Sequence, residues 1–203
     1  MIPKRIAVVG GSTVNGQGDP IGGGFVARLK DWHESNTPET NRVSNLGVVG
    51  DTISLMCERA HAEVSRGQTD LLIVYPGLND TRRTGESSSP PAGDSVIIQH
   101  LLVKLVDTCL RFCPLMLMSA TPPDEQFTTP YRRWFYLRSD AARMAELVKA
   151  IAAERQLPYF DLYERWEDRD DALSFLVDGL HCNAAGHQQL YEELRDFLKQ
   201  LYC

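Results

Sequence analysis

The sequence predicts an α/β fold, a three-layer α/β/α sandwich around a flavodoxin-like, doubly wound parallel sheet of five strands. Short apolar runs alternate along the chain with longer stretches in which apolar residues recur every three or four positions, as strands alternate with crossover helices. The run at residues 70–75, DLLIVY, is apolar almost throughout. A strand of a parallel sheet has this character when helices cover both of its faces.

The expected elements follow this alternation in order. Strands are predicted at residues 5–9, 42–46, 70–75, 114–119 and 158–162. Helices are predicted at residues 24–33, 52–66, 95–112, 140–155 and 184–202. Helical spacing is clearest in the first and last helices, through Phe25, Val26, Leu29 and Trp32 and through Leu190, Leu194, Phe197 and Leu201. Right-handed crossovers then place the carboxyl ends of all the strands at one edge of the sheet, where ligands bind.

Two irregular segments interrupt the alternation. Residues 81–93, TRRTGESSSPPAG, form a long loop rich in Ser, Pro and Gly, and loops of that length are often the rim of an active site. Residues 121–136 carry three aromatic side chains that we expect to line an acyl or aryl pocket, namely Phe127, Tyr131 and Trp134. The alternative is that these aromatic residues pack against the body of the protein.

Length and composition limit the class of protein. The 203 residues fit one domain, residues 1–203, and 43 % of them are hydrophobic. A net charge of −6 without a basic block argues against a nucleic-acid partner, because phosphate binding depends on clustered Lys and Arg. No apolar run approaches the roughly 20 residues that span a bilayer. The five cysteines are an odd number and widely spread, so we expect reduced thiols and a cytoplasmic location.

The stretch VVGGSTVNGQG, residues 8–18, places a serine and a threonine among four glycines directly after the first predicted strand. Such a turn can bind a phosphate through its backbone N–H groups, but the Gly-x-x-x-x-Gly-Lys-Ser/Thr core of a phosphate loop is absent. It can also present Ser12 as a nucleophile. Taken alone, the stretch fits either function or an ordinary turn.

Three further segments fall where the predicted topology brings the chain back to the same edge: NLGVVGDT at 45–52, GLND at 77–80 and DGLH at 178–181. Together with Ser12 they resemble, in order, the four sequence blocks of the SGNH hydrolases, also called the GDSL esterase/lipase family. The resemblance extends over residues 10–187. One departure is that Gly11 precedes the serine where the family usually has Asp, so the hydrogen bonds of that acid must be supplied otherwise.

The resemblance implies a catalytic triad of Ser12, Asp178 and His181. A serine hydroxyl is a poor nucleophile until a base takes its proton, and an imidazole can do so near neutral pH. Asp178, three residues before His181, can reach the far ring nitrogen and hold the tautomer that leaves Nε2 free to accept. The base and its carboxylate thus come from one short segment, at the opposite end of the chain from the serine.

The same resemblance implies an oxyanion hole, a set of donors aimed at the negatively charged oxygen of the tetrahedral intermediate. Its three donors are the backbone N–H of Ser12, the backbone N–H of Gly50 and the side-chain amide of Asn79. Glycine suits position 50 because the missing side chain lets a carbonyl approach the amide. This chemistry requires no cofactor and no metal ion.

The sequence therefore predicts a serine esterase of the lipase/acylhydrolase type that acts on a small-molecule ester through an acyl-enzyme on Ser12. A carbohydrate acetylesterase or a thioesterase would share the whole catalytic set. From other classes, a flavodoxin-like module that binds a phosphorylated ligand, or a catalytically silent scaffold, also fits. The sequence indicates neither the acyl chain nor the oligomeric state.

Overall fold

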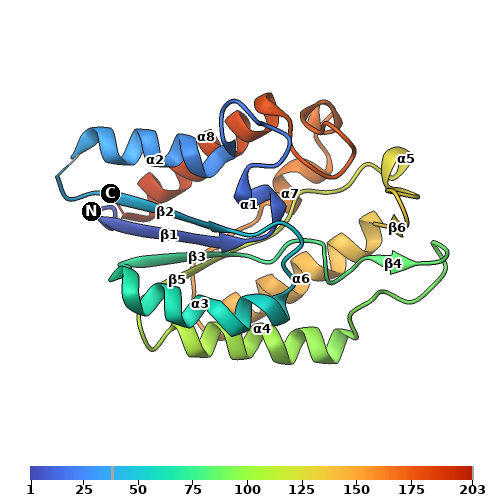
Figure 1. Cartoon of the computed structure of the whole chain (residues 1–203), viewed down its shortest axis with the longest axis horizontal. Coiled ribbons are helices and arrows are strands. Elements are labelled where there is room, and N and C mark those ends of the chain that lie inside the picture. Colours follow the sequence, from blue (N-terminus) through green and yellow to red (C-terminus); the bar gives the residue numbers. More distant parts are fainter. Residues whose placement is uncertain (38, 203) are drawn as a thin grey trace.

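A computed structural model describes residues 1–37 and 39–202 and has the predicted three-layer architecture (Figure 1). Within these residues, parallel strands form a five-stranded sheet in the order β2-β1-β3-β5-β7. The strands are β1 (Arg5–Gly10), β2 (Arg42–Gly47), β3 (Leu71–Tyr75), β5 (Leu115–Met118) and β7 (Tyr159–Phe160). This is the strand order of a doubly wound, flavodoxin-like sheet, so the predicted fold class is confirmed.

Helices cover both faces of the sheet (Figure 1). One face carries α2 (Gly24–Asn36), α7 (Leu162–Glu167) and α8 (Ala184–Tyr202). The other carries α3 (Ile53–Gly67), α4 (Ser95–Cys109) and α6 (Arg138–Glu154). The buried faces largely follow the predicted spacing, but Trp32 and Phe197 are only half-buried, and Leu198 rather than Leu201 is buried in α8. Among the described residues, none of the helices combines the length and apolar character needed to cross a bilayer.

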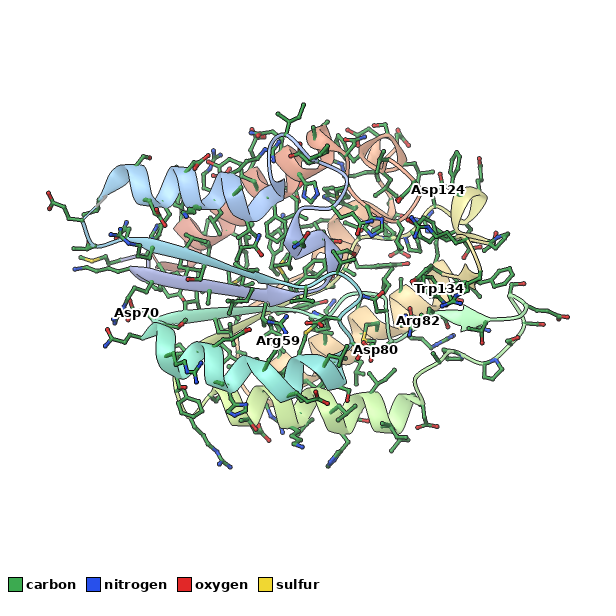
Figure 2. All side chains as sticks on the ribbon, viewed as in Figure 1. Arg59, Asp70, Asp80, Arg82, Asp124 and Trp134 are labelled. Atoms are coloured by element: carbon green, nitrogen blue, oxygen red, sulfur yellow. The ribbon has the colours of Figure 1, made fainter. Side chains whose placement is uncertain are left out.

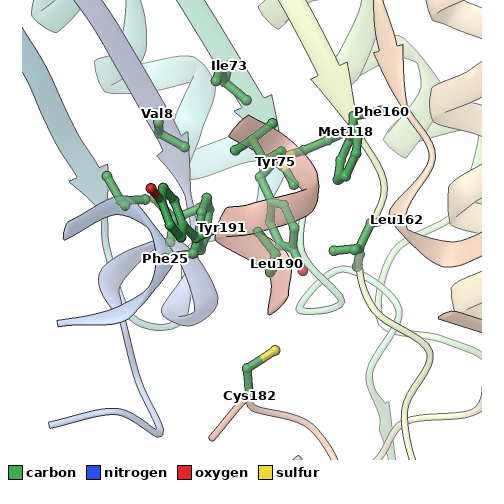
Figure 3. Close-up of a cluster of buried hydrophobic side chains, with 14 of the residues drawn as sticks. Val8, Phe25, Ile73, Tyr75, Met118, Phe160, Leu162, Cys182, Leu190 and Tyr191 are labelled. Atoms are coloured by element: carbon green, nitrogen blue, oxygen red, sulfur yellow. The ribbon is translucent and has the colours of Figure 1, made fainter. Parts of the chain in front are cut away.

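The sheet divides the hydrophobic core into two clusters. Successive side chains of a strand point to opposite faces, so Ile73 and Tyr75 of β3 join one cluster while Leu72 and Val74 join the other. Figure 3 shows the first cluster, in which strand residues meet Phe25 of α2 and Leu190 of α8. This double burial explains why residues 71–75 are all apolar or aromatic.

Several boundaries differ from those predicted. The expected strand at residues 158–162 is reduced to Tyr159–Phe160, because the Asp161 carboxylate accepts from the Glu164 amide and caps α7, which begins at Leu162. Helix α6 begins at Arg138 rather than at residue 140, and α4 ends at Cys109 rather than at residue 112. Short helices α1 (Ser12–Asn15) and η1 (Ala172–Phe175) were not expected.

The two irregular segments pair with each other at the carboxyl edge of the sheet (Figure 1). Strand β4 (Arg83–Thr84) lies in the first segment and pairs antiparallel with β6 (Trp134–Phe135) in the second, which also holds α5 (Glu125–Thr128). Arg83 forms an ion pair of 2.7 Å with the buried Asp140 carboxylate, which ties the first segment to α6. Segments more than 40 residues apart thus form one border beside the strand ends.

Candidate active site

The strand ends bring together the side chains that the sequence separates. Ser12 follows β1 and is the first residue of α1, while Asn79 follows β3. Gly50 lies after β2, and the loop of residues 176–183 returns the chain to the same edge ahead of α8. Because β1 lies between β2 and β3 in the sheet, Ser12 is flanked by the two segments that carry Gly50 and Asn79.

Ser12, His181 and Asp178 form a continuous chain of close contacts. The Oγ of Ser12 lies 2.9 Å from Nε2 of His181, and Nδ1 of His181 lies 2.8 Å from Oδ2 of Asp178. An ionised carboxylate only accepts hydrogen bonds, so Nδ1 carries the proton in the neutral ring. Nε2 is then the acceptor for the Ser12 hydroxyl, which is the arrangement that activates a serine.

The loop that carries Asp178 and His181 is held by its own hydrogen bonds. The other Asp178 oxygen, Oδ1, accepts from the backbone amides of Leu180 at 3.1 Å and His181 at 2.8 Å. Gly179 between them has a φ of +80°, and a Cβ there would lie 2.7 Å from Cβ of Phe127. A residue without a side chain therefore lets this turn pack closely against α5.

Tyr131, in the 121–136 segment, contacts both Asp178 and His181. Its hydroxyl donates to Oδ2 of Asp178 at 2.9 Å, and its ring meets the His181 ring edge-on, with centroids 6.0 Å apart. Burial alone raises the pKa of Asp178, but the hydrogen bonds from His181 and Tyr131 outweigh burial and hold that pKa well below its usual value. Burial and the hydrogen bond to Asp178 raise the pKa of Tyr131 to about 12, so the phenol stays a donor near neutral pH.

Gly50 and Asn79 lie on the other side of Ser12. Gly50 is exposed, has a φ of +87°, and a Cβ built there would meet nothing within 4 Å. The side-chain amide of Asn79 donates to the backbone carbonyl of Asp51 at 2.8 Å. Since that amide has two N–H donors, one of them remains available for a ligand.

A buried ion pair anchors the loop that carries Gly50. The Asp51 carboxylate accepts from Nε of Arg59 at 2.9 Å, and Arg59 also donates to the Leu46 carbonyl at 2.8 Å. Asp80 holds the start of α3 by accepting from the Ile53 amide at 3.0 Å. Burial raises the pKa of Asp80 and this hydrogen bond lowers it, with burial the larger effect. Sequence reasoning did not identify Arg59, because its spacing is that of any exposed helical position.

Gly11 lies against the Asn79 side chain. A Cβ at position 11 would be 3.2 Å from Nδ2 of Asn79, so a larger residue would press on that amide. The turn is held instead by backbone bonds, in which the amides of Asn15 and Gln17 donate at 3.0 Å to the carbonyls of Gly11 and Ser12. These bonds order the turn without an acidic side chain at position 11.

A small cavity of about 20 Å³ opens beside Ser12. That volume holds about one water-sized group. Its walls include Ser12, Asn79, His181, Ala120, Thr121, Tyr75 and Tyr136. Phe127, Tyr131 and Trp134, which we expected to line a pocket, are not among the cavity's lining residues in the described part of the chain.

The three aromatic residues lie instead around the cavity's border. Phe127 is 61 % exposed on α5, Tyr131 donates a hydrogen bond to Asp178, and two arginine side chains stack on the Trp134 ring. Tyr75 and Tyr136 were missed as wall residues, since a tyrosine at the end of an apolar strand looks like core. Only the three-dimensional structure distinguishes the aromatic residues that line the cavity from those that border it.

The fold is a flavodoxin-like α/β/α sandwich, and the contacts of Ser12 with His181 and of His181 with Asp178 lie at the carboxyl edge of its parallel sheet. The model of the GDSL-like lipase/acylhydrolase family matches residues 8–189, and the chain belongs to this family. The protein is therefore a hydrolase that acts on esters. No curated protein sequence matches the chain.

Solved structures share the fold over nearly the whole chain. A lipase/acylhydrolase from Enterococcus faecalis is 20 % identical, with a TM-score of 0.78 over 97 % of this chain and 96 % of that one. Axe2, an acetylxylan esterase from Geobacillus stearothermophilus, is 18 % identical, with a TM-score of 0.73 over 96 % and 94 %. LAE5, an alpha/beta hydrolase enzyme from the metagenome of Lake Arreo in Spain, is 16 % identical, with a TM-score of 0.75 over 98 % and 97 %.

Proposed function

We propose that this protein is a serine esterase that hydrolyses a small carboxylic ester through an acyl-enzyme on Ser12. Ser12 Oγ attacks the ester carbonyl while Nε2 of His181 takes its proton, and the same proton then passes to the departing alcohol. Water attacks the acyl-enzyme with His181 again as base, which releases the acid and restores Ser12. The 2.9 Å contact between Ser12 and His181 is the observation that carries this proposal.

Asp178 holds His181 in the required tautomer and stabilises the imidazolium that forms during each step. The amides of Ser12 and Gly50 and the side chain of Asn79 serve as the oxyanion donors. The open space at Gly50 and the spare N–H of Asn79 support this assignment. Donors fixed before the reaction lower the barrier because they need no reorganisation when charge develops.

The small cavity beside Ser12 favours a short acyl group. At about 20 Å³ it accepts the methyl of an acetyl ester but no long alkyl chain. This supports the carbohydrate acetylesterase among the alternatives over a long-chain lipase or thioesterase, and Axe2 is an acetylxylan esterase with the same fold. We further propose that residues 1–203 act as one hydrolase domain, and that the protein works in the cytoplasm, which rests on its uneven number of cysteines.

Labelling with a fluorophosphonate, followed by mapping of the modified peptide, tests the nucleophile. We expect the label on Ser12 alone, and we expect none on the Ser12→Ala variant, which folds as the wild type does. Label on another residue would reject Ser12. The absence of any label, together with tight binding of inorganic phosphate, would favour the phosphate-binding interpretation of residues 8–18.

Turnover of p-nitrophenyl esters of increasing acyl length tests the cavity argument. We expect kcat/KM to be highest for the acetate and to fall by about tenfold or more at the hexanoate, because a buried chain of that length has no room. Release of acetate from acetylated sugars then separates a carbohydrate acetylesterase from a general esterase. A maximum at long chains would contradict the short-acyl assignment.

A further inference from the structure

Three arginines surround the border of the candidate active site, and we name them the arginine rim: Arg82, Arg132 and Arg133. The guanidinium carbons of Arg82 and Arg133 lie 5.1 Å and 5.0 Å from the centroid of the Trp134 ring. Arg132 lies 5.6 Å from the centroid of Tyr131. Each cation is therefore held against an aromatic face rather than against a carboxylate.

The rim differs from the arginines that support the fold. Arg5, Arg28 and Arg59 each form a close ion pair with an aspartate. Within residues 1–37 and 39–202, by contrast, none of the rim arginines forms an ion pair or donates a hydrogen bond. Arg132 and Arg133 are exposed, and Arg82 is half-buried. Arg82 acts electrostatically on the buried Asp80 carboxylate without forming a close ion pair with it. Positive charge is thus collected at one place in a chain whose net charge is −6.

The rim begins where the cavity opens. Tyr136 lines the cavity, and its ring centroid lies 6.2 Å from that of Tyr131. The guanidinium of Arg132 stacks on the Tyr131 ring. Tyr131 and Trp134 exchange backbone hydrogen bonds of 2.7 Å and 3.0 Å. One tight turn therefore positions both of the rings on which the rim arginines stack. Figure 2 shows Arg82 and Trp134 next to each other beyond the carboxyl ends of the central strands.

The direction of proton transfer assigns the rim to the alcohol part of the substrate. In the proposed reaction His181 gives a proton to the departing oxygen, so the alcohol part must extend past the His181 ring. Tyr131 packs against that ring. We assign the acyl part to the cavity beside Ser12, because a volume of about 20 Å³ suits a small neutral group.

We propose that the arginine rim binds an anionic group on the alcohol part of the ester, so that the substrates are short acyl esters of alcohols that bear a carboxylate, sulfonate or phosphate. This rests on the proposed function, because it uses the same nucleophile and base. A guanidinium stacked on a ring keeps its N–H edges free, and those edges match the paired oxygens of such anions. Stacking also restricts the side chains before the substrate arrives, which reduces the entropy lost on binding.

Matched esters of para-substituted phenols test the proposal. The anionic set is para-acetoxybenzoate, para-acetoxybenzenesulfonate and para-acetoxyphenyl phosphate, and the neutral reference is methyl para-acetoxybenzoate. The quantity measured is the ratio of kcat/KM for each anion to that for the neutral ester, in wild type and in variants. Comparing ratios between proteins cancels the intrinsic reactivity of each leaving group, and the three anions distinguish carboxylate, sulfonate and phosphate as the preferred group.

We expect the double variant Arg132→Gln/Arg133→Gln to lower the ratio about tenfold, mainly through KM, and Arg82→Gln to lower it about threefold. Replacing Arg132 and Arg133 by Lys keeps the positive charge, so we expect a ratio between those of wild type and of the double Gln variant. About 1 M NaCl should lower the wild-type ratio toward that of the double variant, because exposed charges are screened. Arg66→Gln, an exposed arginine in the last turn of α3, is the matched control and leaves the ratio unchanged.

Equal ratios in wild type and in the double Gln variant would overturn the rim proposal while leaving the esterase intact. If the protein is labelled on Ser12 but hydrolyses none of these esters, the measurement is instead how far a ligand slows the labelling. We expect para-hydroxybenzoate to slow labelling more than para-hydroxybenzamide does, and equal protection would also overturn the proposal. Failure of the labelling itself would instead reject the proposed function.

Discussion

The two sides of the space around Ser12 are built differently. On one side, Ser12, His181 and Asp178 are joined by side-chain contacts of 2.9 Å and 2.8 Å, and Tyr131 adds a further hydrogen bond to the carboxylate. On the other side, Gly50 offers a backbone amide at an exposed turn, and Asn79 is bonded to the backbone of the same turn. The side with His181 and Asp178 is held by contacts between side chains, whereas the side with Gly50 and Asn79 depends on the backbone conformation of the turn to which the Asn79 amide is bonded.

Because of this difference, different kinds of substitution should disrupt the two sides. A chain of side-chain hydrogen bonds fails when one member loses its charge or tautomer, even though the fold persists. A backbone turn fails when its dihedral angles change, even though every side chain remains. The four predictions that follow test the two sides, from the largest effect to the smallest.

Asp178→Asn tests the side built from side chains, and we expect kcat to fall about 10⁴-fold. The amide cannot stabilise the imidazolium, and its NH₂ favours the wrong tautomer of His181. Steady-state kinetics on a short acyl ester measure the loss. Asp70→Asn is the matched control: Arg5 holds the pKa of Asp70 below its usual value at the opposite end of the sheet, so that variant should lose stability but keep kcat.

The Asp178→Asn variant also has a predicted pH dependence of stability. Because the pKa of Asp178 is lower in the folded state than in the unfolded chain, its ionised form stabilises the fold above about pH 5. This contribution is lost as the pH falls toward the folded-state pKa. Denaturant titrations between pH 7 and pH 3 should therefore show a smaller decrease in the free energy of unfolding for Asp178→Asn than for wild type. Parallel curves would contradict the depressed pKa.

Asn79→Ala tests the donor side, and we expect kcat to fall by about 10² to 10³ with little change in KM. One oxyanion donor is lost, and it acts in the transition state rather than on the bound ester. Asn41→Ala removes a similar bond, from the Asn41 amide to the His33 carbonyl at 2.9 Å, far from Ser12. That control should lose about 1 kcal/mol of stability and no activity. Equal losses of kcat in both variants would reject a special role for Asn79.

Gly50→Ala tests the backbone itself and has the smallest expected effect. A φ of +87° is strained for alanine, although the space around the new methyl is open, so we expect a loss of about 1 kcal/mol in stability and about tenfold in kcat. Gly85→Ala is closely matched, with a φ of +88° in the loop after β4. It should lose similar stability by thermal denaturation but keep kcat. A normal kcat in Gly50→Ala would show that the turn tolerates the change without moving its amide.

The sequence predicted the fold class because the sheet's apolar pattern is local. The run at residues 70–75 needs both faces buried, and α2 and α8 show their apolar faces through residue spacing. The residues proposed for catalysis were also found in advance, since Ser12, Gly50, Asn79, Asp178 and His181 lie within short blocks that follow strands or precede the last helix. The structure brings these blocks to one edge, and their catalytic roles stay predictions for the experiments above.

The remaining features depend on contacts that no local pattern encodes. Tyr131 and Asp178 are 47 residues apart, and their hydrogen bond follows from how the 121–136 segment folds over the strand ends. Asp161 ended β7 early because its carboxylate caps a helix, although the surrounding apolar residues suggested a longer strand. The ion pair of Asp51 with Arg59 likewise joins a loop to a helix position that resembles any solvent-facing arginine.

The pairing of β4 with β6 has a consequence for how this enzyme could acquire new substrates. Two antiparallel residue pairs, Arg83 with Phe135 and Thr84 with Trp134, couple the two segments that border the cavity. An insertion in one segment would shift its partner as well. Recombination between related genes would therefore change selectivity only if residues 81–93 and 121–136 were exchanged together, from the same source.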